Sequence, residues 1–201
     1  VFGFRPPKQH GHGAVEAIKA LRDGKAKALL CLGGNLAEAI SDPQVTFPAM
    51  RNLDLVVHMA TKLNRSHLLL GKHNYLLPVL GRTETDVQAT GAQSVTVEDS
   101  MSMVHASRGS LNPASPHLKS EPALVASLAK ATLPDSVVDW SAMVADYSRI
   151  RDAIEAVFPA FENFNERIKH SGGFRLHNAA PESVWRTPSG RALVKVTQGT
   201  N

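Results

Sequence analysis

One stretch decides the fold of this chain: Ala28-Leu29-Leu30-Cys31-Leu32-Gly33-Gly34-Asn35-Leu36-Ala37-Glu38. A continuous apolar run stops at two glycines and an asparagine, and a helix-like pattern follows. Such a run predicts a strand buried on both faces, as in a parallel sheet. Glycines at the carboxyl end of the strand let another group approach the backbone closely. Open α/β sheets bind ligands at this edge, where helix N-termini attract anions, so the stretch predicts a site for a phosphate-bearing ligand.

Strand and helix patterns alternate around this stretch. We expect a helix over 13–21, strands over 26–32, 53–58 and 74–78, and a short helix over 64–70. Alternation of this kind is typical of a parallel sheet with right-handed crossovers. The sequence therefore predicts an α/β protein with a Rossmann-like, doubly wound, mostly parallel sheet and helices on both faces.

The second half of the chain is predicted to be helical and extended. Its expected elements are a polar loop-rich segment over 79–118 with a β-like run at 93–97, a helix from Ser120 to about 131, helical stretches over 139–158 and 161–168, and a β-like run within 187–196. The last run has no evident partner, and a terminal strand needs a sheet to join. Because the chain also begins at Val1, we expect a piece of a longer protein.

Composition excludes several classes. The 201 residues carry a net charge of +4, and the basic residues are scattered, so no nucleic-acid stripe is predicted. One cysteine excludes an internal disulfide framework or a CxxC zinc site, and Cys31 is expected to be a small core residue. The nine histidines lack HExxH spacing, and no GxSxG elbow occurs, so neither a metal site nor a hydrolase triad is predicted. No run reaches the ~20 apolar residues of a membrane span and no signal peptide occurs, so we expect no membrane partner and a cytoplasmic location.

A second polar segment follows the second predicted strand: Thr61-Lys62-Leu63-Asn64-Arg65-Ser66-His67. Neighbouring parallel strands end on one edge of a sheet, so this segment should lie near Gly33–Asn35. Lys62 and Arg65 could neutralise phosphates, and Asn64 or Ser66 could cap the next helix while binding a ligand. A tight turn and a solvated surface helix remain the alternatives. GxGxxG and Walker loops are absent, which excludes an ordinary dinucleotide fingerprint.

Taken in order, these segments resemble the molybdopterin oxidoreductase superfamily, in particular its formate-dehydrogenase-like branch (alpha subunit type). The resemblance covers nearly the whole chain and rests on residues 32–35, 53–57, 61–67, 76–84, 97–102 and 120–122. It implies an excised domain of a large protein. On this basis residues 1–135 would form a Rossmann-like cofactor-binding domain, and residues 136–201 a helical extension and linker toward a missing C-terminal β-barrel domain.

The resemblance also implies a site for half of a bis(molybdopterin guanine dinucleotide) cofactor, with molybdenum held in the full protein. The implied cofactor-binding residues are Gly33, Gly34, Asn35, Thr61, Lys62, Asn64, Ser66 and Glu121. The glycine loop would wrap one guanosine diphosphate arm, and the Glu121 carboxylate would accept two N–H bonds from guanine. Some members of the family carry a polar–acidic pair where this chain has Met59 and Ala60. The contacts to the nucleotide are therefore expected from the Thr61–Ser66 segment instead.

The implied function is that of an anchoring domain in a molybdenum-dependent, formate-dehydrogenase-like oxidoreductase. No catalytic residue or metal ligand falls within these residues, because the family places them, and any iron–sulfur cysteines, in preceding segments. The expected partners are the other domains of the parent chain and, in the full enzyme, a small-molecule substrate; the chain alone should be inactive. The alternatives are a non-catalytic docking or nucleotide-binding domain, with 108–116 contacting a partner, and the central domain of a thiamine-diphosphate enzyme.

Overall fold

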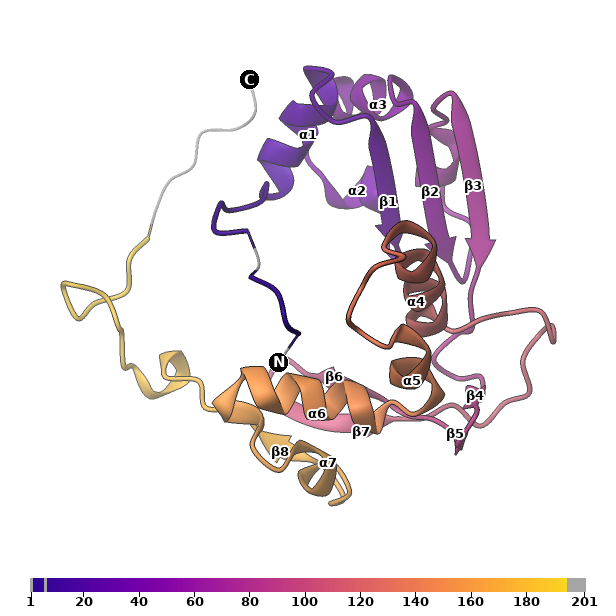
Figure 1. Cartoon of the computed structure of the whole chain (residues 1–201). Coiled ribbons are helices and arrows are strands. Elements are labelled where there is room, and N and C mark those ends of the chain that lie inside the picture. The colour runs from indigo at the N-terminus through magenta and orange to yellow at the C-terminus, as the bar shows by residue number, and fades with distance from the viewer. Residues whose placement is uncertain (1, 6, 195–201) are drawn as a thin grey trace. The chain divides into compact units, whose positions relative to one another are not determined.

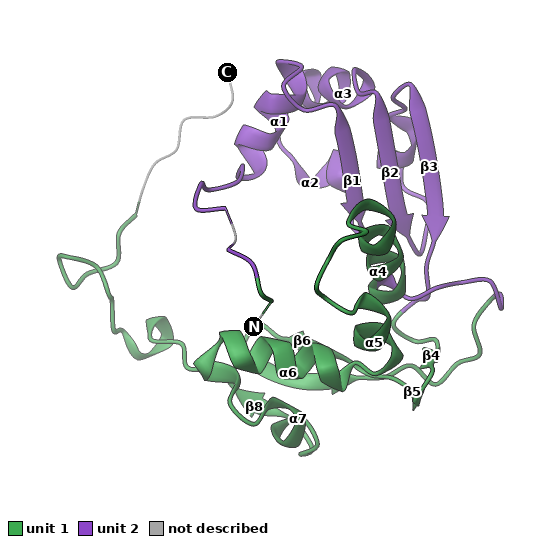
Figure 2. Ribbon diagram, in the orientation of Figure 1, with its two compact units in different colours: residues 1–3, 82–114, 122–197 green, residues 4–81, 115–121, 198–201 purple. Residues whose placement is uncertain are grey.

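The structure is a computed structural model that describes residues 2–5 and 7–194. These residues form two compact units (Figure 2). Unit 2 contains the described residues of 4–81 together with 115–121, and unit 1 contains 2–3, 82–114 and 122–194. The division expected at 135/136 refers to a longer parent protein and stays a prediction.

Unit 2 is built on a parallel sheet of three strands, β1 (Ala28–Leu32), β2 (Leu55–Ala60) and β3 (His73–Pro78). The strands lie side by side in the order β1-β2-β3 and run in one direction (Figure 1). All three predicted strands and the mixed α/β class are confirmed. The strand order contains no reversal among the described residues, so the doubly wound arrangement is not confirmed.

The helical elements of unit 2 are α1 (Ala14–Arg22), α2 (Leu36–Ala39), α3 (Pro43–Arg51) and the 3₁₀ helix η1 (Arg65–Leu68). Helix α1 ends in a Schellman motif, in which the Gly24 N–H donates to Leu21 O at 3.2 Å and the Lys25 N–H to Ala20 O at 2.9 Å. Gly24 has φ +66°, which favours glycine at this position. The motif delivers the chain into β1 and so fixes where the sheet begins.

Strand β1 is covered on one face. Leu29 packs with Val56 of β2 against residues of α1 and α3, among them Ile18 and Ala49. Leu30 and Leu32, which alternate with Leu29, are 47% and 52% exposed. The prediction that this strand is buried on both faces is therefore wrong. An apolar residue at every position conceals the alternation that would distinguish a covered face from an uncovered one.

Unit 1 contains two small antiparallel sheets and most of the later helices. Its strands are β4 (Val87–Gln88), β5 (Gly91–Ala92), β6 (Val95–Glu98), β7 (Met103–Ser107) and β8 (Phe174–Arg175). Its helices are α4 (Glu121–Thr132, whose first residue belongs to unit 2), α5 (Trp140–Ala145), α6 (Ser148–Val157), η2 (Pro159–Phe161), α7 (Phe164–Arg167) and η3 (Ala180–Glu182). The core joins Val104, Phe164, Ile168 and Phe174.

Most expected elements of unit 1 are present, but strands β4, β5 and β7 lie in the segment that was expected to be loop-rich, and strand β8 was not expected. Two further expectations also differ from the structure. The stretch over 139–158 is two helices, because Asp146 has an extended backbone and its carboxylate accepts the Ser148 N–H at 2.9 Å, which starts a new helix. The predicted C-terminal strand is absent from 187–194, where the Gly190 N–H closes a turn on Thr187 O. No strand lies beside this turn among the described residues, so the apolar residues at 192–194 have no backbone partner with which to form a sheet. Residues 195 and 196 of the expected run lie outside the described residues.

Candidate functional site

The loop after β1 is shaped by its two glycines. Gly33 and Gly34 have φ +66° and +71°, in the left-handed region that glycine adopts without steric cost. The Gly33 N–H donates to Met59 O at 2.8 Å, which ties the loop to the carboxyl end of β2. Asn35 then begins the short helix α2. The loop lies at the sheet edge that the sequence predicted for it.

The segment after β2 is hydrogen-bonded to this loop. The Asn64 Nδ2 donates to Gly34 O at 2.9 Å, and its Oδ1 accepts the Ser66 N–H at 3.0 Å. The Ser66 hydroxyl donates to Asn35 Oδ1 at 3.0 Å and accepts the Ala37 N–H at 2.9 Å. The predicted proximity of the two segments is confirmed, and three hydrogen bonds between them maintain it.

These bonds divide the predicted residues by role. Ser66 is 1% exposed and its hydroxyl is used in both directions, so it supports the loop from beneath. The Asn64 side chain is likewise committed through both its amide atoms. Because the Asn35 Oδ1 is the acceptor for Ser66, the Asn35 Nδ2 is the half of this half-buried amide that could donate to a ligand. An amide donor suits an anionic ligand.

A carboxylate from a distant part of the sequence reaches the same loop. Lys119 extends the sheet edge by pairing with Val79, and it accepts the Leu80 N–H at 3.0 Å through its carbonyl. Two residues later, the Glu121 Oε1 lies 3.5 Å from the position that a Cβ on Gly33 would take. The third predicted piece of the site is thus brought against the glycine loop, and glycine leaves the space in front of the carboxylate open.

Two exposed polar residues directly follow β2. Thr61 and Lys62 lie on the surface at the strand's carboxyl end. Arg65, the other predicted cation, forms an ion pair with Glu38 at 2.7 Å. Among residues 2–5 and 7–194 no ion pair involves Lys62, so this ammonium group is the better placed of the two to meet a ligand phosphate.

A pair of histidines beneath the loop was not expected from the sequence. The Asn64 N–H donates to His67 Nδ1 at 2.9 Å, and the His67 ring contacts His58 of β2 edge to face, with ring centroids 4.6 Å apart. His58 is 7% exposed, and its Nε2 has no hydrogen-bond partner among the described residues. Burial, and then the proximity of His67, lower the pKa of His58. Nothing in the spacing of these residues signals the contact.

Cys31 lies beside this pair in the sheet. It is the register partner of His58 on the neighbouring strand, and burial raises the pKa of its thiol. A protonated thiol is a poor nucleophile. Its partial burial and its chemistry agree with the predicted role of a small core residue.

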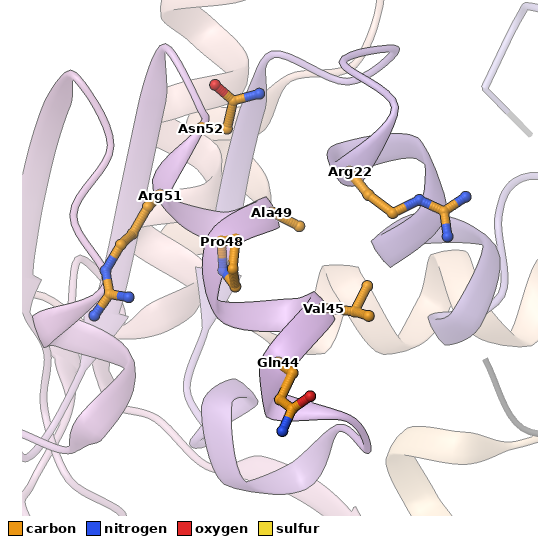
Figure 3. Close-up of a pocket in the computed structure, with 7 residues that line it drawn as sticks. All are labelled: Arg22, Gln44, Val45, Pro48, Ala49, Arg51 and Asn52. Carbon is orange, nitrogen blue, oxygen red and sulfur yellow. The ribbon is translucent and has the colours of Figure 1, made fainter. Parts of the chain in front are cut away.

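Two hollows are lined by residues outside the glycine loop. In unit 2 an open groove of about 710 Å³ follows α3 and the end of α1, and it is lined by Arg22, Gln44, Val45, Pro48, Ala49, Arg51 and Asn52 (Figure 3). Its Arg22 is engaged with Asp23 at 2.8 Å. In unit 1 a hollow of about 460 Å³ is lined by polar residues that include Asp99, His105 and His170. No group of three or more histidine, cysteine, aspartate or glutamate side chains within the described residues is arranged to hold a metal ion.

Comparison with known proteins gives two groups of relatives, and no protein-family description matches the chain. The chain is 56% identical over 198 residues to a protein named YdeP from Escherichia coli K12, covering 98% of this chain and 26% of that protein. It is 44% identical over 193 residues to an uncharacterized oxidoreductase of Mycobacterium tuberculosis, covering 95% of this chain and 25% of that protein. The chain therefore spans about a quarter of the curated relatives it matches.

No helix within residues 2–5 and 7–194 combines the length and the apolar character that crossing a membrane would require.

Proposed function

We propose that this chain is the nucleotide-anchoring part of a molybdenum-dependent, formate-dehydrogenase-like oxidoreductase, and that it binds the guanosine diphosphate portion of a molybdopterin guanine dinucleotide. The oxidoreductase class is supported by the 44% identity to proteins that carry that name. The cofactor is supported by one observation above all. A left-handed glycine loop, a lysine and a carboxylate converge on one edge of a parallel sheet, which is where such sheets bind nucleotides.

The residues fit the two ends of a guanosine diphosphate. Three donors suit the diphosphate: the Nδ2 of the half-buried Asn35, and the Thr61 hydroxyl and Lys62 ammonium group, which belong to exposed residues. The Glu121 carboxylate would repel phosphate, so we assign the guanine to its side of the loop. Guanine offers an N1–H and an exocyclic N2–H that a carboxylate can accept together, and adenine lacks both donors.

The remaining residues keep this surface in shape. Gly33 leaves open the space in front of Glu121 that a Cβ would fill, and Asn64 and Ser66 hold the loop backbone and the Asn35 amide. When bound, the cofactor supplies two-electron redox chemistry at its molybdenum, remote from the nucleotide. The work of this chain is then binding and orientation, and alone it should not oxidise formate with an artificial electron acceptor.

Glu121→Gln tests the proposal. Isothermal titration calorimetry with guanosine and adenosine diphosphates should show a preference for guanosine diphosphate in the unmodified chain. Glutamine replaces one of the two carboxylate oxygens of Glu121 with an NH₂ donor, so one hydrogen bond to guanine is lost. The preference for guanosine diphosphate over adenosine diphosphate should then fall by about tenfold, which corresponds to one hydrogen bond to a charged group. Glu16→Gln removes an exposed carboxylate on α1 and serves as the matched control, which should keep the preference.

Three results would contradict the proposal, each in a different way. Equal affinity for both diphosphates would remove the guanine assignment while leaving a nucleotide site. Preferential binding of thiamine diphosphate would favour a thiamine-dependent enzyme. Absence of any binding at millimolar nucleotide would favour a docking domain. The docking alternative would use the 108–116 loop to contact a partner. Part of the backbone of this loop is already hydrogen-bonded within the chain, because the Ser110 and Leu111 N–H groups donate to Thr83 O and the Thr85 N–H donates to Leu111 O.

A further inference from the structure

The buried His58 side chain carries a polar atom that, among the described residues, has no hydrogen-bond partner. Its Nε2 is enclosed and has no partner among the described residues, although an unpaired buried polar atom costs about 1–3 kcal/mol. Its ring is 4.6 Å from that of His67, at an interplanar angle of 88°. His67 in turn touches the loop segment, so the unpaired imidazole is one contact away from the proposed nucleotide site.

The contacts run from the histidines to the glycine loop in order. His67 Nδ1 accepts the Asn64 N–H, while the Asn64 side chain accepts the Ser66 N–H, which is a reciprocal cap at the start of η1. The same Asn64 side chain donates to Gly34 O. A nitrogen that accepts a hydrogen bond carries no proton, so neutral His67 must hold its proton on Nε2. One of the contacts that hold the glycine loop, the Asn64 bond to Gly34 O, is therefore linked to one histidine tautomer.

We infer that His67 is a positioning residue for the nucleotide loop, whose neutral ring, packed on the buried His58, holds Asn64 and through it the backbone at Gly34. The inference deepens the proposed function and rests on it for the identity of the ligand. A protonated His67 has hydrogens on both nitrogens and cannot accept the Asn64 N–H. Acidification should then release Asn64 and loosen the Gly34 carbonyl.

The surroundings of His58 contain little that would compensate a positive charge on its ring. Burial and His67 both disfavour a charged His58. The other titratable or charged side chains of the elements packed here are Cys31 on β1, Glu38 on α2, Asp42 and Arg51 at the ends of α3, Asp54 just before β2, Arg65 on η1, and His73 and Tyr75 on β3. Glu38 is paired with Arg65 and Asp54 with Lys72, and the strand register places His73 and Tyr75 on the face of the sheet opposite His58.

The test follows the histidine nitrogens and the loop amides by NMR in the 15N-labelled chain, from about pH 7.5 to about pH 5.5, the range in which histidines titrate. At the higher pH His67 should show an unprotonated Nδ1. On acidification the amide signals of Gly34 and Asn64 should move with the same midpoint as the His67 nitrogens. Guanosine diphosphate affinity should fall over this range by about fivefold, as expected for one lost hydrogen bond of ordinary strength.

Matched variants separate a positioning role from a merely structural one. His67→Gln keeps an acceptor at the residue where capping boxes use Glu or Gln, but it does not titrate. It should hold the Gly34 amide at its neutral-pH position throughout and rescue the affinity at the lower pH. His67→Leu should resemble the acidified chain at every pH. His73→Gln replaces an exposed histidine at the start of β3 and should titrate like the unmodified chain.

The outcomes distinguish this inference from the proposed function. A Gly34 amide that ignores His67, or a His67→Gln chain that titrates like the original, would overturn the positioning role whatever the ligand does. If Gly34 follows His67 while guanosine diphosphate binds at no pH, the positioning role stands and the proposed ligand is wrong. Phosphate ionisation of the nucleotide also changes in this range, and comparing the two chains at equal pH removes that contribution.

Discussion

Ser66 joins the two loops of the candidate site, as Asn64 does. Its hydroxyl donates to Asn35 and accepts from the Ala37 N–H, and the side chain is 1% exposed. Ser66→Ala leaves two polar groups without this partner, so we expect unit 2 to lose about 1–3 kcal/mol of stability. The measurement is the free energy of unfolding from hydrogen exchange of the β2 amides.

Ser41→Ala is the matched control for this substitution. Ser41 is exposed in the same unit, and its replacement should change stability by no more than about 0.5 kcal/mol. If the two substitutions changed the free energy of unfolding equally, the hydrogen bonds of the Ser66 hydroxyl would make no net contribution to the stability of unit 2. A stable Ser66→Ala chain that still lost nucleotide affinity would instead show that the hydroxyl acts by orienting Asn35.

At the scale of the element, the β1–α2 turn depends on glycine for its backbone and not for lack of space. A Cβ on Gly34 would meet nothing within 4 Å, yet its φ is +71°. Gly34→Ala should therefore cost about 1–2 kcal/mol, the penalty of an L-residue in the left-handed region. Gly11 also has open space but no positive φ, so Gly11→Ala should be nearly neutral. Chemical denaturation of both chains checks the contrast, and equal midpoints would disprove the strain.

The elements also show what could be predicted from sequence and what could not. Each strand of the parallel sheet is a local apolar run, and the rule that parallel strands end on one edge brought Asn64 and Ser66 to the glycine loop. The exposure of Leu30 and Leu32 was not predictable, because both faces of the run are apolar. The contact of His58 with His67 was not predictable either, since it depends on how a 3₁₀ turn packs against a strand.

At the scale of the whole molecule, the site is assembled from segments that no local pattern links. Glu121 was assigned to the site only through family resemblance, and it reaches Gly33 because the segment before it adds to the sheet edge beside Val79. Which side chains face a ligand follows from hydrogen bonds among partners distant in sequence. Those bonds assign Ser66 and Asn64 to the support of the loop, and on the proposed function Asn35 and Glu121 would meet the ligand.

Each unit has its own apolar core, which predicts that damage to one core stays within its unit. Leu53 of unit 2 is 0% exposed and Phe164 of unit 1 is 1% exposed. Leu53→Ala should cost about 2–5 kcal/mol and Phe164→Ala about 3–5 kcal/mol. Hydrogen exchange should accelerate in β2 for the first variant and in β7 for the second.

Two exposed leucines provide the controls, Leu63 in unit 2 at 75% exposure and Leu111 in unit 1 at 59%. Their replacement by alanine should leave exchange in both units nearly unchanged, because little apolar area returns to water. If either core substitution accelerated β2 and β7 equally, the chain would unfold as one cooperative body. If each substitution accelerates exchange only in its own unit, the glycine loop, which lies wholly in unit 2, keeps its shape when the core of unit 1 is weakened. Guanosine diphosphate affinity should then be retained in Phe164→Ala and lost in Leu53→Ala.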